Sequence, residues 1–152
     1  MNFRDASHED LDPIVALLAD DTLGQTRERY DSPLPDCYED AFQAIQADPN
    51  SRLLVATDDA GVIGCLQITM IPNLSHQGGW RALIEGVRVA PRAQGQGIGR
   101  AMFEHAIELA KAKGCRMVQL TTDRARPDAL AFYESLGFTH SHAGMKLALG
   151  GN

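Results

Sequence analysis

The stretch from Val87 to Arg100, V-R-V-A-P-R-A-Q-G-Q-G-I-G-R, decides how this chain folds. It begins as a strand pattern, passes through a glycine-rich loop and ends where a helical pattern begins. Gly95, Gly97 and Gly99 alternate in the loop, and glycine lets a backbone come close to an anion and direct several N–H groups at it. The helix that follows adds the positive end of its dipole. We therefore predict that this loop holds a pyrophosphate.

Three alternative interpretations fit this loop less well. A P-loop needs Lys-Ser or Lys-Thr after the last glycine, but Arg100 and Ala101 stand there, so that reading fails. The dinucleotide fingerprint G-x-G-x-x-G would need glycine in place of Arg100 or Met102, although Asp123, after the next strand, could take the role of its ribose-binding acid. A tight turn without a ligand is a further alternative, but three alternating glycines exceed what a turn needs. Arg92 and Arg100 are expected to assist the anion.

Composition bounds the rest of the interpretation. The 152 residues fit one domain, residues 1–152, and 44% hydrophobic with 22% charged residues is a globular composition. The net charge of -6 argues against a nucleic-acid binder. The sequence has neither an apolar run of about 18 residues nor an N-terminal secretory pattern. No membrane partner is therefore expected. Three cysteines without metal-ligand spacing favour reduced thiols and a cytoplasmic location.

The residue pattern of the N-terminal half predicts a strand, two helices and a β-hairpin. Ser7 with Asp10 three residues later resembles a capping box, and it precedes an apolar helical face of Leu11, Ile14, Val15 and Leu18. Thr22–Asp36 is expected to be a mobile connection, and Asp36–Ala47 a second helix. Strands are predicted at 52–57 and 62–71, joined by a turn in which Gly61 supplies the positive φ.

The C-terminal half alternates strands and helices. Residues 81–89 predict a strand with Leu83, Glu85, Val87 and Val89 on one face. Elements are then expected at 97–113 (helix, ended by Gly114), 117–122 (strand), 127–136 (helix, closed by Gly137) and 138–149 (one or two strands). The order β-α-α-β-β-β-α-β-α-β(-β) predicts a mixed α/β fold, with a mostly antiparallel sheet of six to seven strands flanked by about four helices.

Two motifs resemble those of a known family. Gln94-x-x-Gly97-x-Gly99, preceded by Val89-x-Pro91, is similar to the acyl-CoA-binding motif of the GNAT N-acetyltransferases. A second family feature, A-x-x-F-Y-E-x-L-G-F, stands at the expected distance downstream, at residues 129–138. The predicted order of elements is also that of the family, so the resemblance covers nearly the whole chain.

The resemblance implies a binding site for acetyl-CoA. Backbone amides of the loop would hold the pyrophosphate, and they belong to Gln94, Gly95, Gln96, Gly97, Ile98, Gly99 and Arg100. The backbone of Val87 and Val89 would pair with the pantetheine arm like an added strand. In the family this strand carries a bulge and diverges from the next one, which opens a slot for the thioester.

Two residues are candidates for proton transfer. A primary amine with a pKa near that of lysine, about 10.4, is mostly protonated at pH 7, and a carboxylate can remove the proton directly or through a water. Glu85 is the candidate base, and its alternative role is that of a solvated or ion-paired strand residue. Tyr133 resembles the family's general acid for the departing thiolate; its alternative role is to pack beside Phe132.

The sequence departs from the family pattern at one position, and the motifs do not identify the acceptor. Many members have Asn where this chain has Arg126, so Arg126, with Arg124, is expected to approach the 3′-phosphate of CoA or to be a solvated loop charge. The acceptor site would lie along 22–38 and 71–80, with Tyr30 and Trp80 as candidate contacts. Those segments also carry Tyr38, His76 and the acidic residues Glu28, Asp31 and Asp36, and Asp20 and Asp21 precede the first of them. These carboxylates would favour a cationic amine unless they are simply solvated.

The sequence therefore predicts an N-acetyltransferase that moves acetyl from acetyl-CoA to a small-molecule amine in a ternary complex. Cys65 and Cys115 lack a histidine partner in the motifs, so a covalent acetyl-cysteine step is not indicated. His140 and His142 share an expected strand face, but without a further ligand they predict no metal. A peptide or protein amine is the alternative acceptor, and a non-catalytic acyl-CoA sensor is the alternative function. Homodimers are common in the resembled family.

Overall fold

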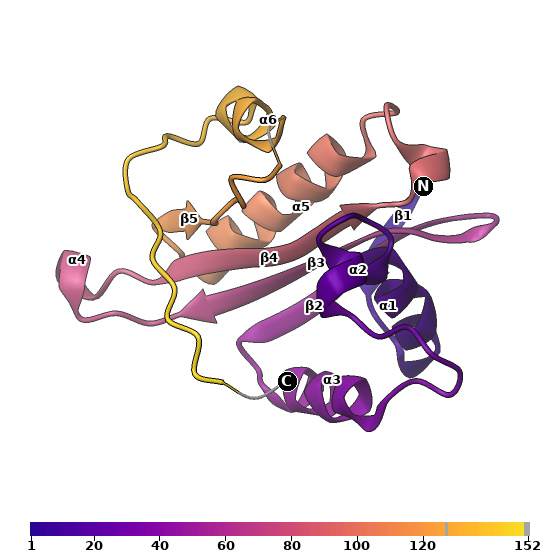
Figure 1. Ribbon diagram of the computed structural model, residues 1–152. Helices are drawn as coiled ribbons and strands as arrows, with labels where there is room; N and C mark the ends of the chain where they lie inside the picture. The colour runs from indigo at the N-terminus through magenta and orange to yellow at the C-terminus, as the bar shows by residue number, and fades with distance from the viewer. Residues whose placement is uncertain (127, 151–152) are drawn as a thin grey trace. The chain divides into compact units, whose positions relative to one another are not determined.

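The computed structural model describes residues 1–126 and 128–150, and its chain divides into two compact units, Met1–Gln119 and Leu120–Asn152 (Figure 1). The first unit contains, in order, β1 (Asn2–Asp5), the 3-10 turn η1 (His8–Asp10), α1 (Leu11–Ala19), α2 (Gly24–Arg27), α3 (Asp36–Ala47), β2 (Ser51–Asp58), β3 (Gly61–Ile71), α4 (Ser75–Gly78), β4 (Arg81–Val89), the 3-10 turn η2 (Pro91–Ala93), α5 (Ile98–Lys113) and β5 (Met117–Gln119). The second unit contains α6 (Ala129–Ser135).

The described strands form one sheet in the order β1-β2-β3-β4-β5. The first four pair antiparallel, and β5 joins β4 in parallel. The β2–β3 hairpin has the predicted turn, in which Gly61 adopts a φ of 120° that side chains other than glycine rarely take. The mixed α/β fold class predicted from the sequence is confirmed.

Helices cover both faces of the sheet, as Figure 1 shows. On one face, Leu11 and Val15 of α1 pack with Phe42 of α3 and with Leu53 of β2. On the other, Met102 of α5 lies so close to Gly64 of β3 that a Cβ built on this glycine would be 2.6 Å from the Met102 sulfur. We refer to these as the α1–α3 face and the α5 face.

Local sequence explains how two of these helices begin and end. The capping box is confirmed, because the Ser7 backbone N–H and hydroxyl both donate to Asp10 Oδ2, at 2.7 and 3.1 Å. The buried residues of α5, namely Ile98, Met102, Phe103, Ala106 and Ala110, follow helical spacing. Gly114, with a φ of 89°, then closes α5 in the left-handed conformation, as predicted.

Two elements differ from the sequence prediction, and the predicted start of a third lies outside the described residues. The connection 22–36 contains a short helix, α2, where the prediction placed no helix. β5 ends at Gln119 rather than at 122, and α6 is described only from Ala129, so the predicted helix start at Pro127 lies outside the described residues. Within α4, His76, Gln77 and Gly78 have φ angles of 54°, 57° and 73°, so this segment is a left-handed turn and not a regular helix.

The prediction of strands at 138–149 is wrong. All of these residues are described, none is in a strand, and Met145, Leu147 and Leu149 are 94%, 85% and 91% exposed. Alternating apolar residues favour a strand, but a strand forms only when a neighbour supplies hydrogen bonds, and this segment has no ladder partner within the described residues. The sheet of the described residues therefore has five strands instead of six or seven.

Candidate active site

The glycine-rich loop lies between β4 and α5, as predicted. Gly95 and Gly97 adopt left-handed φ angles of 77° and 79°, and a Cβ built at either position meets no atom within 4 Å. Glycine is therefore required there by backbone conformation and not by lack of space. The first i→i−4 bond of α5 runs from the Ala101 N–H to the Gly97 carbonyl, at 3.1 Å, so the amides of residues 98–100 precede it. Such a turn at a helix N-terminus is suited to an anion.

Side chains hold this loop against the strand before it. The side-chain amide of Gln94 donates to the Val89 carbonyl at 3.2 Å, and the side-chain amide of Gln96 donates to the Arg92 carbonyl at 3.4 Å. Arg92 makes two hydrogen bonds, of 2.8 and 3.1 Å, to Asp58, the last residue of β2, and these lower the pKa of Asp58 to about 2. The guanidinium that we expected to assist the anion thus binds the hairpin in this structure.

β4 carries a bulge. Cys65 pairs with Arg88 and Gln67 with Glu85, so the single residue Leu66 of β3 lies opposite the two residues between Glu85 and Arg88. The first of those two is Gly86, whose φ is 61°. A glycine in this conformation is typical of a bulge with one extra residue, which bends the strand and reverses the alternation of side chains beyond it.

The bulge corrects the prediction that Glu85 and Val89 share a face. Glu85 lies opposite Gln67, which pairs with Leu53 on the α1–α3 face, whereas Val89 lies opposite Gly64 on the α5 face. Strict alternation over four residues would have placed them together, and the extra residue places them apart. Glu85 is exposed and lies on the face from which α1 leads into the expected acceptor segment.

The ladder between β4 and β5 is short. It joins Arg81–Leu83 to Met117–Gln119, so within the described residues Glu85–Val89 have a strand partner, β3, on one side only. This arrangement agrees with the divergence of the two strands that the family resemblance implies. A strand edge of this kind is able to pair with an extended ligand.

The second unit carries Tyr133 and Arg126. The half-buried ring of Tyr133 lies edge-on to Phe132 and Phe138, with centroids 5.5 and 6.1 Å apart. The Phe138 N–H donates to the Tyr133 carbonyl at 3.1 Å, which closes α6. Arg126, also half-buried, lies in the turn before α6, where its N–H donates to the Asp123 carbonyl.

The candidate acceptor aromatics have partners of their own. The Tyr30 hydroxyl donates to Asp12 at 2.7 Å, and this bond raises the pKa of Tyr30. The Lys113 ammonium lies 5.6 Å from the centroid of the Trp80 ring, and the Arg116 N–H donates to the Trp80 carbonyl at 2.9 Å. These contacts connect Trp80 to the segment between α5 and β5.

Much of the expected acidic cluster is neutralised by neighbouring groups. Asp21 pairs with Arg88 at 3.4 Å, and Asp31 with Arg29 at 2.6 Å. Glu28 lies 3.9 Å from Arg27 Nε and accepts a hydrogen bond of 2.9 Å from the Tyr38 hydroxyl. These partners reduce the attraction that the segment would exert on a cationic acceptor.

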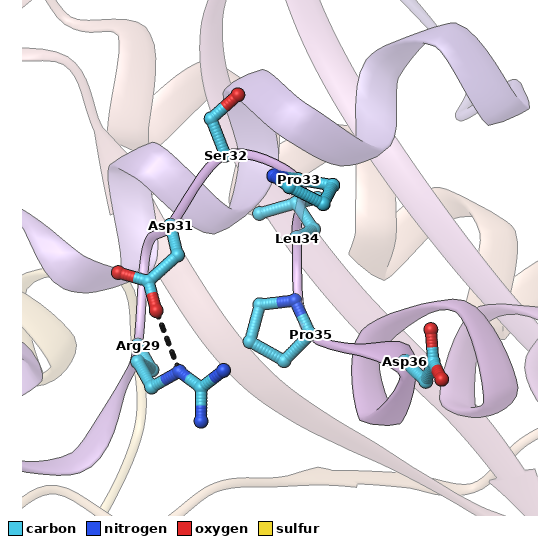
Figure 2. Close-up of a pocket in the computed structure, with 7 residues that line it drawn as sticks. All are labelled: Arg29, Asp31, Ser32, Pro33, Leu34, Pro35 and Asp36. Atoms are coloured by element: carbon cyan, nitrogen blue, oxygen red, sulfur yellow. Dashed lines mark hydrogen bonds and ion pairs between the residues drawn. The ribbon is translucent and has the colours of Figure 1, made fainter.

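An open depression of about 630 Å³ lies in the α2–α3 connection (Figure 2). Its lining residues are Arg29, Asp31, Ser32, Pro33, Leu34, Pro35 and Asp36. Figure 2 shows the Arg29–Asp31 bond, and the lining residues run from this connection to Asp36, the first residue of α3. The depression lies within the predicted acceptor segment 22–38 and includes the acidic residues Asp31 and Asp36, but it contains neither Tyr30 nor Trp80.

The thiols and histidines do not assemble into a reactive or metal-binding group. Burial raises the pKa of the Cys65 thiol to about 12 and also raises that of Cys115, so both are poor nucleophiles. His140 and His142 are exposed and lie outside any strand. No cluster of three or more His, Cys, Asp or Glu side chains suited to a metal occurs among residues 1–126 and 128–150.

Three residues around the bulge were missed by the sequence analysis: Cys65, Gly86 and Arg88. An isolated glycine within a strand pattern is the signal that could have located the bulge at Gly86. Nothing in the sequence indicates that the side chains of Cys65 and Arg88 bind its backbone, because those contacts depend on strand register.

Comparison with known proteins agrees with this geometry. Residues 17–138 match the model of the acetyltransferase (GNAT) family. The chain is 31% identical over 139 residues to the aminoalkylphosphonate N-acetyltransferase of Salmonella typhimurium, covering 91% of this chain and 85% of that protein. The structure is also similar to that of a protein described as a transcriptional regulator from Bacillus halodurans, with a TM-score of 0.95 and 51% identity over 97% and 99% of the two chains.

A further solved structure supports the same conclusion. A putative acetyltransferase from Agrobacterium tumefaciens superimposes with a TM-score of 0.85 at 29% identity, covering 97% of this chain and 99% of that one. Among the described residues, no helix is long and apolar enough to cross a membrane. The matched residues include the glycine loop, the strand before it and the second motif at 129–138. The chain therefore belongs to the acetyltransferase (GNAT) family and is an N-acetyltransferase.

Proposed function

We propose that this enzyme transfers the acetyl group of acetyl-CoA directly to the primary amine of a small molecule, with both substrates bound at once. The observation that carries the proposal is the left-handed pair Gly95 and Gly97 between β4 and the N-terminus of α5. Left-handed residues in such a turn are typical of backbone nests that bind anions, and α5 adds its dipole. The acidic net charge of the chain makes such a local field necessary for capturing an anion.

We expect residues of this chain to contact CoA along its length. Amides of 94–100 would hold the pyrophosphate, the backbone of Val87 and Val89 would pair with pantetheine, and Arg126 would approach the 3′-phosphate. The partly unpaired edge of β4 supports the second role. Because Gln94 already donates to the Val89 carbonyl, we expect the Val89 amide to be the group used for pairing. When bound, acetyl-CoA supplies an activated acetyl thioester.

Glu85 is the proposed base. Its carboxylate takes the proton of the acceptor ammonium, directly or through a water, so that the amine becomes nucleophilic. Its exposure supports this role, because the acceptor has to reach it, and so does its position on the face of the acceptor segment.

Tyr133 is the proposed acid. Its phenol donates a proton to the departing sulfur, and its family-matching position at 133 supports the assignment.

The thiols favour direct transfer, because a buried Cys65 with a pKa of about 12 does not accept the acetyl group at neutral pH.

A small amine that carries an anionic group is the acceptor class that we favour. The Salmonella relative acts on aminoalkylphosphonates, as its name states, and partners within this chain neutralise much of the acidic segment. Tyr30 and Trp80 are proposed to contact the acceptor. A peptide amine is the alternative acceptor.

The test is release of free thiol from acetyl-CoA in the presence of single amines. The panel contains an aminoalkylphosphonate, the matched alkylamine without phosphonate, a polyamine and a peptide with a free N-terminus. We expect amine-dependent release, with the phosphonate compound gaining one acetyl group by mass. Release with the peptide alone would transfer the proposal to protein amines.

A second function, a non-catalytic acyl-CoA sensor, is favoured by the Bacillus halodurans structure described as a transcriptional regulator. Tight CoA binding without thiol release for any amine would support it. Retention of both Glu85 and Tyr133 favours the enzyme, since a sensor requires neither.

The cellular location, the domain organisation and the assembly of the protein are also proposals. A cytoplasmic location agrees with the reduced cysteines, none of which forms a disulfide in the described part of the chain. The family match at 17–138 spans both compact units, which supports a single domain. A homodimer is the assembly that we expect, and sedimentation equilibrium measures it.

A further inference from the structure

The backbone carbonyls of the β4 bulge are held by side chains. Gly86 and Val87 are the two residues opposite Leu66, where the regular ladder is interrupted. The Cys65 thiol donates to the Gly86 carbonyl at 3.5 Å, and Arg88 Nη1 donates to the Val87 carbonyl at 2.8 Å. Each bulge residue therefore has a side-chain donor on its carbonyl.

Both donors are well placed to be rigid. Cys65 is 1% exposed, and burial raises its pKa to about 12, so the thiol keeps its proton and remains a donor across the neutral range. The Arg88 side chain is 16% exposed. A polar side chain held at this depth defines a geometry better than a solvated one, because water does not compete for its hydrogen bonds.

Arg88 also connects the bulge to the acceptor side. Its Nε lies 3.4 Å from Asp21 Oδ2, and Asp21 Oδ1 accepts the Gly24 N–H at 2.5 Å at the start of α2. The backbone there is tightly packed, because a Cβ at Gly24 would lie 2.0 Å from the Leu18 carbonyl oxygen. Arg88 and Asp21 therefore connect the start of α2 to β4 through side-chain contacts.

Leu18, at the end of α1, lies beside the same junction. Its Cδ2 atom is 3.8 Å from the position that a Cβ at Gly86 would occupy, so a side chain added at Gly86 would reach van der Waals distance of Leu18. The end of α1 therefore lies next to the bulge, and the polar contacts of Arg88 and Asp21 reach it from α2. A shift of either element would change the path of the strand edge.

We infer that Cys65 and Arg88 are positioning residues that fix the bulge of β4, and that Arg88, through Asp21, sets the acceptor segment against the strand that pairs with CoA. The inference rests on the proposed function, because it gives the strand edge its role. It adds three residues that touch neither substrate in the proposed mechanism. Their effect reaches the substrates through the backbone of 86–89.

The test compares five single variants with the wild-type protein. Arg88→Met removes the charge and the donor at similar length, Asp21→Asn removes the ion pair, and Cys65→Ala removes the thiol donor. Cys65→Ser restores a donor at the same position. The matched control is Arg52→Met, because Arg52 makes a two-bond pair with Asp5 between β1 and β2, away from the bulge.

Three quantities are measured for each protein: amide hydrogen exchange at 86–89, the CoA dissociation constant by calorimetry, and the KM for the amine. We expect Arg88→Met, Asp21→Asn and Cys65→Ala to speed exchange at the bulge, and the first two to raise both constants about tenfold. Cys65→Ser and Arg52→Met should stay near wild type. The double variant Arg88→Met/Asp21→Asn should cost no more than the larger single effect.

The outcomes separate the two proposals. Lower melting temperatures with unchanged exchange, CoA affinity and KM would overturn the inference and leave the enzyme function intact. A wild-type protein that neither binds CoA nor transfers acetyl would overturn the proposed function, whereas faster exchange in the variants would still support the positioning role. If Arg88→Met does not fold, Asp21→Asn decides, because it removes only one partner of the chain at a less buried site.

Discussion

Glu85 is the residue whose assignment changes most between sequence and structure. The sequence identifies it as an acid on the strand before the glycine loop, and the bulge then places it on the α1–α3 face rather than on the face of Val89. One extra residue, Gly86, accounts for the difference. The identity of the candidate base was therefore predictable, but its orientation depended on register, which only the pairing of β3 and β4 defines.

Glu85→Gln should lower kcat/KM for the amine by about 100-fold and leave the CoA dissociation constant unchanged. The carboxamide keeps the shape but no longer accepts the ammonium proton, and general-base catalysis contributes about 10²–10⁴-fold. Steady-state thiol release with calorimetry measures both quantities. Glu108→Gln, on the exposed side of α5, is the control. Unchanged kcat/KM in Glu85→Gln would remove the residue from the mechanism.

Tyr133→Phe should reduce kcat while the CoA dissociation constant stays at the wild-type value. Phe retains the edge contacts with Phe132 and Phe138 but lacks the hydroxyl that would protonate the sulfur. A thioester with a better leaving group, such as an acetylated aryl thiol, needs less protonation and should restore the rate. Equal losses with both donors would point to a packing role for Tyr133.

At the scale of elements, the β2–β3 hairpin and the turn η2 are joined by one ion pair. Arg92 holds Asp58 in two hydrogen bonds and lowers its pKa to about 2. The sequence assigned Arg92 to the anion because it precedes the glycines. It could not reveal a partner that is 34 positions away along the chain.

A carbon-detected NMR titration of Asp58 should give a midpoint near 2, and Arg92→Ala should return it to the ordinary carboxyl range near 4. Because the pKa of Asp58 is depressed in the folded state, its stabilising contribution is present above the unfolded value and disappears as pH falls toward 2. An unshifted midpoint in the wild-type protein would show that the pair does not persist in solution. In that case Arg92 would be available to an anion.

Elements defined by local patterns were predicted well. Asp36–Ala47 agrees with α3 at both ends, and Gly114 closes α5, because caps, turn glycines and helical spacing are short-range signals. The glycine loop belongs to the same class, since its left-handed residues must be glycine. The bulge and the short helix α2 were missed because both depend on contacts with other parts of the chain.

At the scale of the whole molecule, the largest difference between the sequence prediction and the structure lies in the C-terminal region. Met145, Leu147 and Leu149 alternate as strand residues do, yet the segment is exposed and unpaired within the described residues. Alternation records which side chains favour burial, and it does not supply the neighbouring strand. The sheet therefore has fewer strands than the pattern predicted.

Stability of the folded chain should depend on Asp10, a buried acid outside the site. Hydrogen bonds from Arg4, of 2.6 and 3.0 Å, lower its pKa. Asp10→Asn should reduce the free energy of unfolding by about 1–3 kcal/mol at pH 7. Since the pKa is depressed in the folded state, this difference is full above the unfolded value and diminishes as pH falls through the folded one.

Urea denaturation at pH 7 and at pH 3 measures the dependence on Asp10. Asp59→Asn, at an exposed position in the β2–β3 turn, is the control and should leave stability unchanged at both values. A loss in Asp10→Asn that is equally large at both pH values would show that the ionisation of Asp10 does not account for it.

The central claim is that the turn between β4 and α5 holds the pyrophosphate of CoA. Calorimetric titration of CoA into Gly97→Ala and Gly114→Ala tests it most directly. Both glycines have left-handed φ angles, of 79° and 89°, and open space around a Cβ, so both variants carry the same strain of about 1–2 kcal/mol at opposite ends of α5. We predict a CoA dissociation constant at least tenfold higher for Gly97→Ala and unchanged for Gly114→Ala. Equal affinity in both variants and the wild-type protein would contradict the claim.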